Sequence, residues 1–373
     1  MARKPGKTGS VSSLDRIETP ALLLHLDVVE RNLERMAQRA KALGVALRPH
    51  AKTHKCPELA ARQLALGAVG LTVATLAEAE AFVKAGAKDL TWALPIDRTH
   101  IAHARRLDRR ATLRVVTDDL ETAQALAGSG LHVWLKVDCG YHRAGVDPES
   151  PYAMAVAREL AREDGLTFDG LLSHSGHAYK TASRDAAAAV AESERETMVR
   201  FAQRLRVGGL PVRGISVGST PAMMAVEDLS GATEARPGNY VFFDRTMVLI
   251  GCCTPEDIGV TVLTSVVSHQ PGAGHFVVDA GALALSKDTG PAHLDLAPAL
   301  GAVRGHTDLT LASLSQEHGI VRGACERLEG HYPVGSRIEI EPNHSCLTVA
   351  HFDQYHVVRD GRVIDHWRIE RGR

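Results

Sequence analysis

The chain has 373 residues, of which 45% are hydrophobic and only 4% aromatic, and its formal net charge is -1. This length and apolar content allow two packed cores, while the balanced charge excludes the strongly basic surface of a nucleic-acid-binding protein. No run approaches the roughly 20 apolar residues that cross a bilayer, so we expect no membrane span. The six cysteines follow no repeated spacing, which favours reduced thiols in the cytoplasm over a disulfide framework.

The predicted elements begin after a short basic segment. Residues 1–18 lack the apolar stretch of a signal peptide, and we expect them to form a flexible tail. The run LDVVERNLERMAQRAKALG then predicts a helix, because Asp27 and Glu30 form a capping-box pattern and apolar residues recur every three or four positions. Gly44 is expected to end this helix.

Short β-branched runs alternate with Ala-rich helical segments up to about residue 250. The alternation predicts an α/β fold, a (β/α)8 TIM-type barrel over residues 28–250. Its eight strands are expected at 45–50, 69–74, 89–94, 111–116, 131–138, 168–174, 212–218 and 236–243. After about residue 250 the sequence becomes rich in β-branched residues, which predicts a second, mainly antiparallel β domain over 251–373.

The segment RPHAKTHK places Lys52 just after the first predicted barrel strand, where such barrels carry their chemistry. Burial and neighbouring cations favour a neutral amine, which can attack a carbonyl and form a Schiff base. The flanking His50 and His54 can supply proton transfer or ring contacts. The alternative is an exposed loop in which Lys52 and Lys55 are simply solvated.

Two later segments suit a phosphate group. SVGSTPA follows the seventh predicted strand, and RPGNYVFFD forms the eighth. The candidate contacts in these segments are Gly218, Ser219, Thr220, Gly238, Asn239 and Tyr240. Loops after strands seven and eight are a common phosphate site of barrels, although each segment alone is also typical of a structural turn. A lysine that faces a phosphate site predicts pyridoxal 5′-phosphate, whose aldehyde needs an amine.

Six motifs in order carry a family resemblance: RPHAKTHK, VDCGYHRAGV, SVGSTP, RPGNYVFFD, SQEHG and PNHSC. The chain resembles the fold-type III pyridoxal phosphate enzymes, which are built like alanine racemase, and within them the D-serine dehydratase and D-threonine aldolase group. The resemblance implies that Lys52 bonds the cofactor and that Arg143 lies beside the phenolic oxygen. It also implies that residues 19–27 form a strand of the C-terminal domain, and that the protein is a head-to-tail homodimer with its sites at the subunit interface.

Three further side chains near the predicted site have more than one interpretation. Arg143 can pair with the nearby Asp147 instead of contacting the cofactor. His174 and His177 follow the sixth predicted strand, on the same barrel face. Relatives often carry tyrosine where this chain has His174, so a cofactor contact there departs from the family pattern. His177 is a candidate second acid or base, with a packing role as the alternative.

His344 and Cys346 stand two residues apart in PNHSC, a segment that we predict as a strand with both side chains on one face. A buried histidine and a small apolar cysteine are the common explanation of this spacing. The resemblance implies instead a divalent metal ion at this pair, beside the cofactor. Imidazole and thiolate suit zinc, whereas relatives with aspartate at the second position accept manganese or magnesium.

The resemblance predicts a lyase that acts on D-configured β-hydroxy-α-amino acids. Loss of the α-proton to Lys52 and of the β-hydroxyl gives a 2-keto acid and ammonia, whereas cleavage of the Cα–Cβ bond is the aldolase reaction. The residues of the SQEHG and RPGNY motifs, together with the cysteine at position 346, resemble the D-serine dehydratase type more than D-threonine aldolase. Two other classes stay open: a non-catalytic pyridoxal-phosphate-binding protein, and a zinc hydrolase that adds His351 or His356 to the metal pair.

Overall fold

The chain folds into two compact units in its computed structural model, which describes residues 12–162, 165–270, 272–323, 328 and 332–371. The barrel unit holds Asn32–Val241, Met247–Cys253 and the chain from Glu370 onward. The β unit holds the chain up to Arg31, Phe242–Thr246 and Thr254–Ile369. We describe each unit by itself.

The strands of the barrel unit form one parallel sheet. They are β3 (Ala46–Leu47), β4 (Leu71–Val73), β5 (Asp89–Pro95), β6 (Thr112–Thr117), β7 (His132–Lys136), β8 (Thr167–Leu172), β9 (Gly214–Val217) and β10 (Glu234–Ala235). Their order in space is β3-β10-β9-β8-β7-β6-β5-β4. The two outer strands meet at a parallel bridge between His50 and Thr72, where the N–H of Ala51 donates to the Thr72 carbonyl at 2.7 Å. These described strands therefore close into the (β/α)8 barrel that the alternating pattern predicted.

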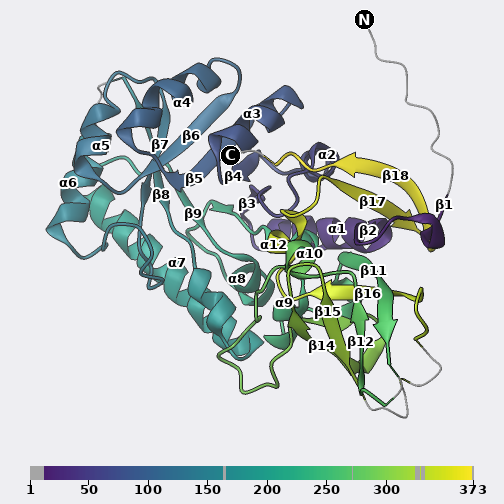
Figure 1. Cartoon of the computed structure of the whole chain (residues 1–373). Helices are drawn as coiled ribbons and strands as arrows, with labels where there is room; N and C mark the ends of the chain where they lie inside the picture. The colour runs from purple at the N-terminus through teal and green to yellow at the C-terminus, as the bar shows by residue number, and fades with distance from the viewer. Residues whose placement is uncertain (1–11, 163–164, 271, 324–327, 329–331, 372–373) are drawn as a thin grey trace, which may run out of the picture. The chain divides into compact units, whose positions relative to one another are not determined.

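Helices follow the strands, and the longer ones cover the outside of the sheet (Figure 1). They are α1 (Leu26–Ala42), α2 (Pro57–Ala65), α3 (Leu76–Lys84), η2 (Arg98–His100), α4 (Ile101–Asp108), α5 (Leu120–Ala125), α6 (Pro151–Leu160), η3 (Gly176–Lys180), α7 (Arg184–Val207), α8 (Thr220–Ala225), η4 (Asn239–Val241) and α9 (Arg245–Leu249). Side-chain caps begin several of them, because Thr75, Ser150 and Ser183 each accept a backbone N–H three residues later. No described helix is long and apolar enough to cross a membrane.

The predicted position of the eighth strand is wrong. The strand is β10, which ends at Ala235, and the stretch predicted as strand instead contains the 3-10 helix η4. Pro237 has no N–H to offer to a sheet ladder, which explains why pairing stops before it. The RPGNY motif therefore follows the strand and lies at its C-terminal end.

Charged side chains near the starts of β5, β6, β8 and β10 are matched with opposite charges, together with Arg48, which directly follows β3. Arg48 donates from Nε to Glu234 Oε2 at 2.6 Å and also bonds to Asp89. Arg114 bonds to Asp89 as well, and its Nε lies 3.1 Å from Asp169 Oδ2. We call these five residues the paired cluster. Buried and partly buried charges of this kind are compatible with a stable fold because each has a partner.

The β unit is built on a sheet that begins and ends with the chain. Its elements are β1 (Ser12–Ser13), η1 (Leu14–Arg16), β2 (Ala21–His25), η5 (Pro255–Asp257), β11 (Val260–His269), β12 (His275–Val278), α10 (Ala282–Leu285), β13 (Gly301–Val303), β14 (His306–Leu314), β15 (Gly319–Arg322), β16 (Arg337–Pro342), α12 (Ser345–Val349), β17 (Gln354–Arg359) and β18 (Arg362–Arg368). The order is β1-β18-β17-β2-β11-β12-β15-β14-β13-β16, with a further β11–β16 pairing. Nearly all neighbours are antiparallel, as predicted, and β2 lies parallel to β17.

The N-terminal segment expected as a flexible tail is only partly described. Residues 1–11 lie outside the described residues. The segment that follows forms β1, which pairs with β18 in antiparallel register, and then η1. The buried leucines of β2, Leu22 to Leu24, come next and lie in the core of the β unit.

Candidate functional site

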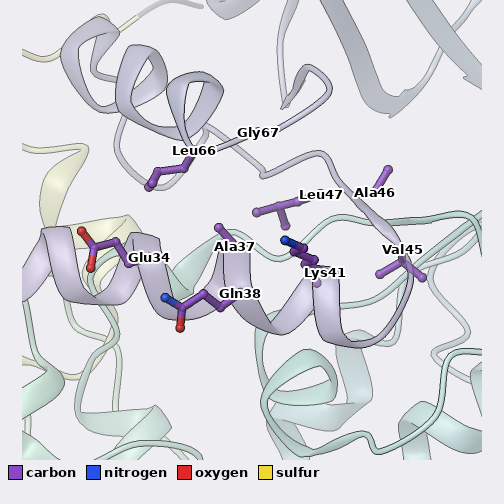
Figure 2. Close-up of a pocket in the computed structure, with 10 residues that line it drawn as sticks. Glu34, Ala37, Gln38, Lys41, Val45, Ala46, Leu47, Leu66 and Gly67 are labelled. Atoms are coloured by element: carbon purple, nitrogen blue, oxygen red, sulfur yellow. The ribbon is translucent and has the colours of Figure 1, made fainter.

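Two hollows of the barrel unit have similar volumes but lie at opposite ends of the strands. The first, of about 410 Å³, is lined by α1, by the link into β3 and by the end of α2 (Figure 2). Lys41, Val45 and Leu66 are among its lining residues, and all precede the strands that follow them. It therefore lies at the N-terminal ends of the strands, away from the face where barrels carry their chemistry.

The second hollow, of about 400 Å³, is lined by residues that end or follow barrel strands, and we call it the basic pocket. Its lining residues are His50, Lys52, Ala74, Ala93, Leu94, Pro95, Lys136, Arg143, Ala144, Leu172, His174 and Arg236. They include two lysines, two arginines and two histidines, but no aspartate or glutamate. Cations that face a hollow without an acidic partner suit an anionic ligand.

Lys52 lies in this pocket, half-buried, immediately after the bridge that closes the barrel. Its backbone N–H donates to Nδ1 of His50 at 3.4 Å. Burial and the charge of Lys52 lower the pKa of His50 well below its usual value. His50 is therefore neutral, with its proton on Nε2, and can donate a hydrogen bond to a ligand.

Two further basic residues of RPHAKTHK, His54 and Lys55, do not line the pocket. His54 is buried, accepts a backbone N–H at Nδ1 and shares a hydrogen bond of 3.1 Å with Gln63, and burial lowers its pKa to about 4. Lys55 forms an ion pair with the buried Glu78. The basic residues of the motif therefore have different roles. Lys52 lines the basic pocket, whereas His54 and Lys55 hold the loop in place.

Two cations of the pocket were not proposed as site residues from the sequence. Lys136 ends β7, and burial together with Arg236 lowers the pKa of its amine to about 7. Arg236 follows β10 and donates to the carbonyl of Ser173 and the hydroxyl of Ser216. A sequence signal existed for each, since Lys136 is the only lysine of the strand HVWLK, which has an apolar centre, and Arg236 begins the RPGNY motif.

Arg143 lines the basic pocket, and its guanidinium lies over the ring of Tyr141 at 4.9 Å from the centroid. The structure describes Asp147 too, and no ion pair joins the two. The pairing with Asp147 that the sequence left open is therefore not formed. The aromatic contact holds the guanidinium and leaves its N–H groups available for an anion.

His174 and His177 have different surroundings. Nδ1 of His174 donates to the carbonyl of Gly218 at 3.3 Å, and burial with the charge of Lys136 lowers the pKa of His174 well below its usual value. Its Nε2 is therefore an acceptor. His177 stacks on Tyr141 with ring centroids 6.2 Å apart and is not among the residues that line the basic pocket. Burial lowers the pKa of His177.

The two segments predicted to hold a phosphate are joined by one hydroxyl. Thr220 Oγ1 accepts hydrogen bonds from the backbone N–H groups of Gly238 and Tyr240, both at 3.2 Å. A side chain at Gly238 would meet Cβ of His50 at 3.0 Å, so only glycine lets RPGNY approach the lysine loop this closely. Asn239, between these donors, is buried. The structure thus brings the three predicted motifs together.

The turn before α8 is held from below by a buried carboxylate. The N–H of Gly218 donates to both oxygens of Glu194, at 3.2 and 3.1 Å, so it is not available for a phosphate. Ser219 begins α8 and donates from Oγ to the carbonyl of Ser175 at 3.0 Å. Gly218 adopts φ +101, a conformation that favours glycine. Its role here is to shape the turn.

The candidate metal ligands His344 and Cys346 lie in the β unit, and the strand predicted for them is wrong. Strand β16 ends at Pro342, and His344 is the residue before helix α12, which contains Cys346. The two side chains nevertheless form a hydrogen bond with each other. Asp288, which the sequence did not suggest, accepts from Nδ1 of His344 at 3.0 Å.

The donors around His344 fit a divalent cation. Burial opposes its charge, but hydrogen bonds to Asp288 and Cys346 raise the pKa of His344 to about 11. Several acidic groups therefore surround a single imidazole, a balance that a metal ion also satisfies. A carboxylate on one ring nitrogen is the usual partner of a metal-binding histidine. Among the described residues no third ligand completes the pair, and neither His351 nor His356 joins it.

Comparisons with known proteins identify the family of the chain. Residues 24–246 match the family of the alanine racemase N-terminal domain, and residues 259–358 match the putative serine dehydratase domain. The chain belongs to the alanine racemase-like family. A D-threo-3-hydroxyaspartate dehydratase of Delftia sp. (strain HT23) is 39% identical to it, over 94% of this chain and 97% of that protein.

Other members of this family and their solved structures are similar over nearly the whole chain. D-serine dehydratase of Dictyostelium discoideum is 35% identical, and D-threonine aldolase of Arthrobacter sp. is 32% identical, each over 95% of this chain and over 97% and 93% of those proteins. The structure of the Delftia dehydratase superposes with a TM-score of 0.92, covering 96% of this chain and 98% of that one. Alanine racemase of Bacillus anthracis, at 13% identity and a TM-score of 0.69 over 94% of this chain and 98% of that one, shows the shared fold.

Proposed function

We propose that the protein is a pyridoxal phosphate- and metal-dependent lyase that converts D-β-hydroxy-α-amino acids to 2-keto acids and ammonia. The basic pocket carries this proposal, because it joins a half-buried lysine to cations and neutral imidazoles without any lining carboxylate. An aldehyde with a phosphate and a phenolic oxygen is the cofactor that this combination suits. Dehydratases at 39% and 35% identity support the reaction type.

In this proposal the side chains of the barrel unit divide the work of binding. Lys52 bonds the cofactor and moves the proton at the substrate Cα, while Arg143 contacts the phenolic oxygen. His50 and His174 offer one donor and one acceptor to the ring and substrate. When bound, pyridoxal phosphate supplies an electron sink for the pair left by a broken bond to Cα. His177 is proposed as a second acid or base.

The phosphate is assigned to the two linked segments after β9 and β10. Thr220 and Asn239 are the proposed direct contacts. Ser219, Gly238 and Tyr240 are proposed to hold the site in shape, because the Ser219 hydroxyl already donates to the Ser175 carbonyl and the two N–H groups already donate to Thr220. Gly218 shapes the turn. This arrangement leaves the phosphate at the barrel face where short loops and helix starts commonly receive one.

His344 and Cys346 are proposed to hold a divalent ion, with zinc favoured by the imidazole and thiolate donors over manganese or magnesium. Such an ion would supply a Lewis acid for the substrate hydroxyl. We further propose a homodimer, on the family resemblance. No disulfide joins the five described cysteines, which supports a reducing compartment such as the cytoplasm.

The reaction test separates dehydratase from aldolase. Protein loaded with pyridoxal phosphate and zinc is incubated with D-serine, D-threonine and D-threo-3-hydroxyaspartate, with the L isomers as controls. We expect 2-keto acid and ammonia from the D isomers, a loss of activity on chelation, and recovery with zinc. Cys346→Ala should reproduce the loss, whereas Cys253→Ala should not.

The alternative within the class is aldolase activity, which the 32% identity to D-threonine aldolase favours. Glycine and acetaldehyde from D-threonine without ammonia would reverse the assignment. The absorption spectrum addresses the other classes. If the spectrum shows bound cofactor but no substrate is turned over, the protein is a non-catalytic binding protein. If the protein has no cofactor absorbance, contains zinc and hydrolyses a substrate, it is a zinc hydrolase.

A further inference from the structure

One amine of the basic pocket has no task in the proposed function. Lys136 ends β7, and only 5% of it is exposed, although its side chain lines the pocket. Among the described residues, no carboxylate or carbonyl forms a hydrogen bond or ion pair with its amine. A lysine that is buried without a partner and faces a hollow is costly to the fold unless a ligand completes it.

The surroundings of Lys136 are mainly cationic. The charged and titratable groups that act on it are Arg236, Cys139, Glu194, Arg143 and His174. Two of them are guanidinium groups, and the carboxylate among them is already bonded to Ser173 and to the turn before α8. Burial and Arg236 therefore keep the pKa of Lys136 near 7, so that much of the amine is neutral at neutral pH.

We propose that Lys136 is a ligand-binding residue that takes up a proton when an anionic oxygen enters the basic pocket. The proposal rests on the proposed function, because the anions it concerns are the phosphate and phenolic oxygens of the cofactor and the carboxylate of the amino acid. The proton comes from the buffer and becomes the third N–H of an ammonium group, and no other bond changes. An anion next to the amine raises its pKa by direct attraction.

The coupling has a physical benefit for the empty protein. A neutral Lys136 removes one positive charge from a pocket that also holds Lys52, Arg143 and Arg236. Repulsion among these cations is thus reduced until the ligand arrives, when the extra charge strengthens binding. Binding should therefore weaken above neutral pH more steeply than ligand ionisation alone explains.

Calorimetry of the cofactor-free protein tests this inference. Pyridoxine 5′-phosphate is the probe, because it has no aldehyde and cannot bond to Lys52. Titrations at pH 8 in two buffers with different ionisation enthalpies give the number of protons taken up. We expect the wild type to take up about one proton per site more than Lys136→Met. Lys88→Met, which removes an exposed lysine, should behave like the wild type.

Equal proton uptake by the wild type and Lys136→Met would overturn the inference. If Lys136→Met does not fold, trace acylation of the wild type over a pH series measures the same property. The Lys136 peptide should titrate near neutral pH without ligand and at higher pH with pyridoxine 5′-phosphate. An unchanged titration midpoint contradicts the proposal.

Further arms separate the source of the anion and the failure of the proposed function. Proton uptake with pyridoxine 5′-phosphate assigns Lys136 to the cofactor, whereas uptake only when D-lactate is added to the loaded protein assigns it to the substrate carboxylate. Either result supports the proposal. Probe binding without uptake in either arm refutes the role of Lys136 alone, while a failure of pyridoxal phosphate to attach at Lys52 refutes the proposed function.

Discussion

Arg48 and Arg236 are both buried arginines of the barrel unit, yet of the two only Arg48 meets carboxylates at hydrogen-bonding distance. Arg48 and Arg114 of the paired cluster share Asp89. Arg236, at the other end, donates to a hydroxyl and a carbonyl, and Arg143 rests on an aromatic ring. The arginines with carboxylate partners stabilise the fold. The arginines without such partners are available to bind an anionic ligand.

The largest effect is expected at Lys52, the lysine of the basic pocket that is proposed to bond the cofactor. Lys52→Ala should reduce turnover by roughly 10²–10⁴-fold, the range of a lost proton-transfer group, with little change in unfolding free energy. Borohydride reduction and peptide mapping should find the cofactor on the peptide that contains Lys52. A label on Lys136 or Lys55 instead would refute the assignment. Lys88→Met is the control for the removal of a lysine.

The paired cluster should respond in the opposite way. Arg48→Met leaves Glu234 and part of Asp89 without their cation, which should lower the unfolding free energy by about 3–5 kcal/mol. Arg143→Met, at the other end, should change the stability of the cofactor-free protein by less than about 0.5 kcal/mol. Urea unfolding of both variants measures the difference. Equal destabilisation would remove the distinction between the two ends.

His54 belongs to the same motif as Lys52 but is packed into the interior, so it is expected to affect stability and not ligand binding. Its pKa of about 4 in the fold lies below the usual 6.5, so the unfolded chain binds the proton first. Stability is fully present above pH 6.5 and is lost as the pH falls toward 4, by roughly 3 kcal/mol in total. Unfolding curves from pH 7 to 4.5 should show a steeper slope in the wild type than in His54→Gln, which keeps the slope contributed by His50 and His174.

The smallest effect is expected at the phosphate segments. Thr220→Val removes the hydroxyl that accepts two N–H groups and should weaken cofactor retention by about 1–2 kcal/mol. Ser219→Ala removes the hydrogen bond to the Ser175 carbonyl that holds the turn, and should weaken retention by a similar amount. Dialysis against buffer, followed by the absorbance of the bound cofactor, measures retention. Unchanged retention in both variants would move the phosphate elsewhere.

Local patterns predicted most of the barrel but not its last strand. Seven strands overlap their predicted positions because apolar β-branched runs between helical segments have one favourable arrangement. The eighth was misplaced because Tyr240, Phe242 and Phe243 have high β propensity, while Pro237 prevents sheet pairing just before them. Their burial outside any strand depends on contacts distant in sequence.

The candidate site was less accessible to sequence reasoning than the fold. Lys136 and Arg236 are brought to one pocket by barrel closure. The local sequence around each residue does not predict that the two lie close together. Asp288 lies 56 residues before His344, so its hydrogen bond could not be inferred from spacing. The metal pair was predicted as a strand, yet the two side chains meet across the start of a short helix.

Thr220 shows how an uncharged residue can favour an anion. Its hydroxyl oxygen accepts two backbone N–H groups, so both lone pairs are occupied and the orientation of the group is fixed. Hydrogen bonds in such a chain polarise one another, which makes the remaining hydroxyl proton a stronger donor than that of an isolated threonine. This electronic polarisation is independent of net charge. It therefore persists at pH values where the lysine amines of the barrel have lost their protons.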